Sequence, residues 1–166
     1  MNKMVFKVGD HVVYPTHGVG VITGEETQKI GGVEIRVFVI AFTRDKMILR
    51  VPVTRAQIAG LRHVSGDEDI TKVISTLKGK AKTKRGMWSR RAQEYEAKIN
   101  SGNILSLAEV VRDLHKNVDQ PDRSYSERMI YESALGRLVG EFAASKKIDQ
   151  QKATEELLVV LKQVAA

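Results

Sequence analysis

The spacing of the hydrophobic residues changes at Ser65, and this change constrains the fold more than any other feature of the chain. Before Ser65, short apolar stretches alternate with polar residues and are separated by glycines, as in β-strands. After Ser65, apolar residues recur every three or four positions, as on one face of a helix. The pattern predicts an α+β protein with a β-rich domain at residues 1–64 and an all-helical domain at residues 65–166. The 166 residues suffice for two small domains.

The first 64 residues contain five candidate strands. They are HVVYP, VGVITGEETQKI, VEIRVFVIAF, RDKMILRVPV and LRHV. Gly31 and Gly32 separate the second strand from the third and form a two-residue hairpin signal. Five short antiparallel strands are too few for a sandwich, so we expect a small, strongly bent β-barrel.

The second half contains five candidate helices. We expect them at 65–78, Ser89–Asn100, Ser106–Lys116, Ser124–Lys146 and Asp149–Val164. Serines followed three residues later by glutamate, at Ser106/Glu109 and Ser124/Glu127, predict capping boxes at two of the helix starts. Between the first two helices, KGKAKTKRGM at residues 78–87 has no hydrophobic period and is expected to be a basic loop.

The positive charge is concentrated in one segment. The formal net charge is +7, and residues 72–91 hold eight basic and no acidic residues. The remaining residues are close to neutral. A run of cations is usually a solvated linker, but one that carries the whole excess is better interpreted as a contact surface for a polyanion.

No motif indicates catalysis or a cofactor. The four histidines are scattered, there is no cysteine, and neither a phosphate-binding glycine loop nor a zinc motif occurs. The SxxK match at 75–78 lacks its partner motifs. We therefore expect no enzyme activity, no cofactor and no metal site. No apolar run approaches a membrane span and no signal peptide is recognisable, so we expect a cytoplasmic protein.

Trp88, the one tryptophan of the chain, stands among four cations, Lys84, Arg85, Arg90 and Arg91. Such a ring could stack on a base or open a base step while the cations hold phosphates. The sequence therefore makes these residues a candidate nucleic-acid contact.

The helix that follows allows two placements of this ring. If the helix begins before Trp88, the ring starts an apolar stripe that faces the core. That stripe would comprise Trp88, Ala92, Tyr95 and Ile99. If Ser89 is the N-cap, Trp88 lies just outside the helix, and its stapling partner would be the polar Gln93. The sequence leaves both placements open.

Five stretches of the chain carry a resemblance to a known family. They are FKVGDHVVYPTHGVGVI (6–22), ILRVPV (48–53), WSRR (88–91), SGNILSLAEVVRDLHK (101–116) and SERMIYESALGRLVGE (126–141). Together they resemble the CarD family of bacterial transcription regulators. The first stretch is shared with the polymerase-binding module of transcription-repair coupling factors, so the combination of all five makes the resemblance specific.

The resemblance implies a Tudor-like or SH3-like barrel that binds the RNA polymerase β subunit and a helical domain that contacts promoter DNA. Trp88 matches the family's wedge, which enters the minor groove at the upstream edge of the melted bubble, largely independently of sequence. Arg90 and Arg91 match its basic neighbours. Arg50, with Val51 and Pro52 beside it, matches the polymerase contact. Gln28 is also expected at the polymerase contact, and it departs from the family there, since some relatives carry a basic residue at this position of the polymerase-facing surface.

The function we expect is therefore regulation of transcription initiation by stabilising the open promoter complex. We expect a monomer that associates with the nucleoid through polymerase. The alternative is an architectural DNA- or RNA-binding protein that acts without polymerase. An autonomous binder of this kind would hold nucleic acid tightly by itself at physiological salt.

Overall fold

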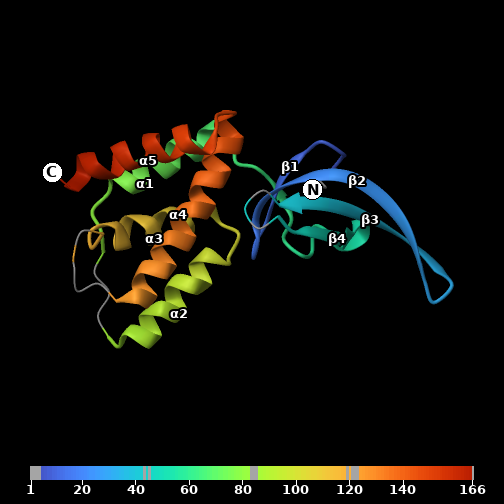
Figure 1. The fold of residues 1–166 in the computed structure, drawn as a ribbon, viewed down its shortest axis with the longest axis horizontal. Coiled ribbons are helices and arrows are strands. Elements are labelled where there is room, and N and C mark those ends of the chain that lie inside the picture. The colour runs from blue at the N-terminus through green and yellow to red at the C-terminus, as the bar shows by residue number, and fades with distance from the viewer. Residues whose placement is uncertain are drawn as a thin grey trace. The chain divides into compact units, whose positions relative to one another are not determined.

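The chain forms two compact units, Met1–Val64 and Ser65–Ala166. The computed structural model describes residues 5–42, 44, 46–82, 86–118, 120 and 124–165. The first unit holds the strands and the second holds the long helices (Figure 1). The predicted α+β class with two parts of different secondary structure is therefore confirmed.

The first unit is a five-stranded antiparallel sheet. Its strands are β1 (His11–Tyr14), β2 (Gly18–Ile30), β3 (Val33–Phe42), β4 (Ile48–Pro52) and β5 (Arg62–His63). A short 3₁₀ helix, η1 (Val53–Arg55), follows β4. The strand order is β4-β3-β2-β1-β5, so β4 and β5 are the two edges. The strands that the structure describes therefore form an open sheet rather than a closed barrel.

The hairpin between β2 and β3 turns where the two glycines predicted it. Gly31 and Gly32 both have positive φ, 59° and 82°, and Ile30 pairs with Val33 across the turn. Positive φ at both central residues is what a two-residue hairpin of type I′ requires. Figure 1 shows the hairpin as a long ribbon that extends beyond β4, whose partners on β3 run only from Val37 to Ala41.

The core of the sheet lies mainly on the face of β3 that carries Phe38, Ile40 and Phe42. These residues pack with others from the whole unit: Val12, Ile22, Val51, Ala56 and Leu61. Side chains of β3 thus alternate between two faces, and the face with the two phenylalanines is the one that joins the cluster. Val37 and Val39 on the opposite face are also buried, whereas Val33 near the turn is exposed.

The second unit contains five helices. They are α1 (Asp67–Lys78), α2 (Trp88–Ile99), α3 (Ile104–His115), α4 (Tyr125–Lys146) and α5 (Gln150–Ala165). α3 buries residues on several sides, including Leu107, Ala108 and Asp113, and packs against α1, α2 and α4. None of the helices in the described part of the chain has the length and apolarity needed to cross a bilayer.

Two of the predicted helix starts are wrong, and one is confirmed. α3 begins at Ile104, because the Asn103 side chain accepts hydrogen bonds from the N–H groups of residues 105 and 106, so Ser106 lies inside the helix. α2 begins at Trp88 with Met87 as N-cap, so Ser89 does not cap it. Ser124 does cap α4, since its hydroxyl accepts from the N–H of Glu127 at 3.1 Å.

Candidate functional site

Trp88 is the first residue of α2. Met87 before it is extended, with φ −64° and ψ 141°, and the Met87 carbonyl accepts the N–H of Arg91 at 3.1 Å. No side chain among the described residues caps this end, and no acidic residue occupies the first turn. A helix start of this kind favours a negatively charged group close to it.

The indole ring is partly buried and lies at the outer end of an apolar stripe. Its centroid is 6.3 Å from that of Tyr95, which is 1% exposed, with 43° between the planes. Ile99 continues the stripe and is buried, and Trp88 and Ala92 pack against the same cluster. The core-stripe placement is therefore correct. The ring nevertheless keeps some exposed surface, as a residue that contacts DNA requires.

The two arginines after Trp88 have different surroundings. Arg90 is exposed. Arg91 is partly buried, and its guanidinium carbon lies 5.4 Å from the centroid of the Trp88 ring. The Arg91 Nε is buried and has no hydrogen-bond partner among the described residues. Lys84 and Arg85, the other two cations predicted to bind DNA, lie outside the described residues.

The start of the basic loop is attached to α3. Asp113 is 2% exposed, and its Oδ1 accepts from the backbone N–H of Lys82 at 2.9 Å and from the Arg112 Nε at 2.8 Å. Lys80 and Lys82 are exposed. The loop therefore leaves the helical bundle from a fixed point, with its described lysine side chains in solvent.

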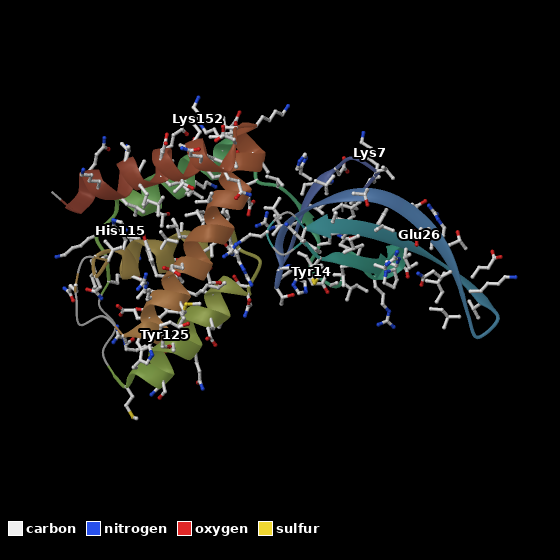
Figure 2. All side chains as sticks on the ribbon, viewed as in Figure 1. Lys7, Tyr14, Glu26, His115, Tyr125 and Lys152 are labelled. Atoms are coloured by element: carbon white, nitrogen blue, oxygen red, sulfur yellow. The ribbon has the colours of Figure 1, made fainter. Side chains whose placement is uncertain are left out.

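Arg50 lies on the edge strand β4 and is already paired. Its Nε lies 3.2 Å from the Glu26 Oε2, and each side chain is 48% exposed. Figure 2 labels Glu26 on β2, and the pair spans the intervening strand β3. The sequence did not indicate Glu26 as the partner of Arg50, because this pairing depends on the register of β2 with β3 and of β3 with β4.

The other residues expected at the polymerase contact have unequal access to solvent. Gln28 is partly exposed and pairs with Ile35 in the ribbon. Pro52 is partly exposed at the end of β4. Val51 is only 5% exposed and packs in the core of the sheet, so its side chain does not face a partner. Val51 can contribute only its backbone at the sheet edge.

Residues suited to metal binding do not gather in the part of the chain that the structure describes. No group of three or more His, Asp or Glu residues there could hold an ion. His63 lies 3.3 Å from the Asp10 carboxylate, and the Nδ1 of His115 lies 2.6 Å from the Tyr131 hydroxyl. Each of these two histidines therefore contacts another side chain of the protein and does not belong to a cluster of metal-binding residues among those that the structure describes.

These features define a class of two-part α+β proteins. One part is an open antiparallel sheet with an arginine on an edge strand. The other part is a helical unit in which a tryptophan begins a helix that follows a basic loop. Two family models match in series, the CarD-like/TRCF RID domain at residues 6–65 and the CarD C-terminal domain at residues 72–158. The chain belongs to the CarD family of transcription regulators. Its first unit matches the CarD-like/TRCF RID domain, a family of RNA polymerase-interacting domains.

One relative is similar along nearly its whole length. It is a Bacillus subtilis (strain 168) protein described as "Putative transcription factor YdeB", with 25% identity over 148 residues. The match covers 89% of this chain and 97% of the relative. The similarity therefore includes both units rather than one shared module.

Proposed function

We propose that this protein binds the β subunit of RNA polymerase through its sheet unit and stabilises the open promoter complex through its helical unit. The wedge is Trp88, which enters the minor groove at the upstream edge of the bubble. Arg90 and the basic loop, including Lys84 and Arg85, attract the phosphates. No reaction is catalysed, and the action depends on binding alone.

The observation that carries this proposal is the position of Trp88. Its ring lies at the start of a helix that has no acidic residue in its first turn, and part of the ring is exposed. A helix start attracts phosphate, and an aromatic ring held beside it can stack on a base. The exposed Arg90 supplies a cation within two residues of the ring.

The polymerase contact is supported by the edge position of β4. One side of β4 pairs with β3, and no described strand pairs with its other side. Such an edge can accept a strand of a partner, which fits a polymerase-interacting domain. Arg50 projects from this strand and would lie at the docking surface, where its partner in the free protein is Glu26.

The size of the effect follows from the stacking energy. Stacking of one base on an aromatic side chain is worth roughly 1–3 kcal/mol. At 1.4 kcal/mol per factor of ten, this corresponds to a shift of about five- to a hundredfold in the population of the open state. The wedge would oppose restacking at the bubble edge, so the open complex would decay more slowly.

The test measures the decay of open complexes after a competitor is added, with and without the protein. The wild-type protein is expected to lengthen the lifetime, and Trp88→Ala is expected to lose most of this effect while still binding the isolated β lobe in a pull-down. If the wild-type protein binds no polymerase but holds duplex DNA or RNA tightly at physiological salt, the polymerase-independent architectural function replaces this proposal.

A further inference from the structure

We propose that Arg91 is a positioning residue that holds the Trp88 ring, rather than a phosphate contact. Its effect on transcription rests on the proposed function, but the contact itself belongs to the free protein. Trp88 and Arg91 are adjacent on the helix surface, whereas Arg90 lies on another side of the helix. The two neighbouring arginines therefore have different roles, with Arg90 left to bind phosphate.

The start of α2 at Trp88 determines this geometry. Arg91 lies three residues after Trp88, and Tyr95 lies seven residues after Trp88, so all three share one face of the helix. Arg90 is two residues from Trp88, which at 3.6 residues per turn places it about 200° around the helix axis. Arg90 thus projects away from the ring, in agreement with its exposed side chain.

The contact of Arg91 with the ring is of the cation–π type. The guanidinium carbon lies 5.4 Å from the ring centroid, within the distance at which a cation is attracted to an indole face. The same ring also packs against Tyr95, with 6.3 Å between the two ring centroids. The indole therefore has two neighbours on its own helix that limit its rotation.

The buried Nε of Arg91 supports a role inside the protein. This atom has no hydrogen-bond partner among the described residues. Guanidinium groups stay charged, and burying one of their N–H groups without a partner is unfavourable. Attraction to the indole offsets part of that cost. A residue that binds phosphate would instead keep its donors in solvent, as Arg90 does.

A fixed ring loses less conformational entropy when it enters DNA, because it already occupies one orientation. Without Arg91 the indole would sample other rotamers before binding. Cation–π contacts of ordinary strength correspond to a loss of about two- to fivefold in open-complex lifetime. Complete loss of the wedge should have a larger effect.

The contact can be tested on the full-length protein without DNA, because Trp88 is the only tryptophan and its fluorescence reports this site alone. Arg91→Met keeps most of the apolar stem and removes the cation. We expect this variant to increase acrylamide quenching and to lower the fluorescence anisotropy of the ring. Arg90→Ala is the matched control and should leave both unchanged. Unchanged quenching and anisotropy in Arg91→Met, with a normal circular dichroism spectrum, would overturn the proposal.

A second measurement separates ring positioning from phosphate binding. The slope of log affinity against log salt is measured for the polymerase–promoter complex. Arg90→Ala should reduce the slope by about 0.9, the value for one lost phosphate contact. Arg91→Met should leave the slope unchanged and shorten the open-complex lifetime. An equal fall in slope for both variants contradicts the proposal and makes Arg91 a phosphate contact.

The failure of the proposed function would look different. In that case Trp88→Ala and Arg91→Met would both leave the open-complex lifetime unchanged, while the fluorescence of Arg91→Met would still report a released ring. That result would support the contact between Arg91 and Trp88 and reject the wedge. Arg91→Ala, which also removes the buried stem, adds a check: its quenching should be at least that of Arg91→Met.

Discussion

The Glu141 carboxylate accepts two hydrogen bonds from Ser65. Its Oε2 lies 2.9 Å from the Ser65 backbone nitrogen and 2.5 Å from the Ser65 hydroxyl. Glu141 is 2% exposed, and the Ser65 carbonyl in turn accepts from the Ser145 hydroxyl. The first residue of the helical unit is therefore attached to α4 by charge-assisted bonds.

We expect Glu141→Ala to destabilise the helical unit by about 2–4 kcal/mol, because the buried Ser65 donors lose a charged acceptor. The measurement is urea denaturation followed by Trp88 fluorescence, which reports the same unit. Glu132→Ala on the same helix is the matched control. Glu132 is 53% exposed and pairs with Arg128, so its loss should cost about 0.5 kcal/mol or less. Equal effects of the two substitutions would mean that the buried bonds do not stabilise the unit.

For Trp88→Ala we expect a moderate loss of stability together with faster decay of open complexes. Truncation of a fully buried aromatic residue costs roughly 3–5 kcal/mol, and the partial exposure of this ring lowers the expected value to about 1–3 kcal/mol. Thermal unfolding measured by circular dichroism tests the first part. Should the variant unfold at the assay temperature, the faster decay would be explained by loss of the helical unit and not by loss of a wedge.

For Arg50→Glu we expect weaker binding to the isolated polymerase β lobe and little change in stability. The exposed pair with Glu26 is worth about 1 kcal/mol or less, so the sheet should survive. Arg36→Glu is the matched control, because Arg36 pairs with Glu25 at 2.6 Å in the ribbon beyond β4. A pull-down that shows the same loss for both variants would indicate a general charge effect rather than a contact at β4.

Gly20→Ala should destabilise the sheet unit by about 1–3 kcal/mol, the usual cost of overpacking. An added Cβ would lie 2.7 Å from the Ile40 Cγ2 and 3.0 Å from the Ala41 carbonyl oxygen. Gly24→Ala on the same strand has no atom within 4 Å of its added Cβ and should be nearly neutral. Urea denaturation followed by far-ultraviolet circular dichroism compares the two. A neutral Gly20→Ala would show that β3 can move away from β2 at little cost.

The parts of the fold that depend on local pattern were predictable from the sequence. The Gly31–Gly32 turn and the cap at Ser124 each depend on residues only a few positions apart, and the structure confirms both. Ser89 and Ser106 were predicted as N-caps by the same kind of local pattern, but both helices begin at residues upstream of them. Asn103 caps α3 with its side chain, and packing of Trp88 on Tyr95 draws residue 88 into α2.

The contacts that join distant segments were not predictable. Ser65 and Glu141 are 76 residues apart, and Lys82 meets Asp113 across 31 residues. No local period encodes such pairs. Only part of the candidate site was predictable. The cations around Trp88 are evident from the sequence, but the sequence did not decide whether Trp88 lies inside the helix or just before it. That Arg90 and Arg91 point to different sides of α2 became clear only once the helix was seen to begin at Trp88.

Because Arg50 is already bound to Glu26 in the free protein, any carboxylate on a partner must replace one that is present. The exchange leaves the number of ion pairs unchanged, so its net electrostatic free energy is small. Selectivity at this edge would then come from backbone pairing and shape. The neutralised guanidinium also exerts a weaker long-range attraction, so encounter rates at this surface should depend little on ionic strength.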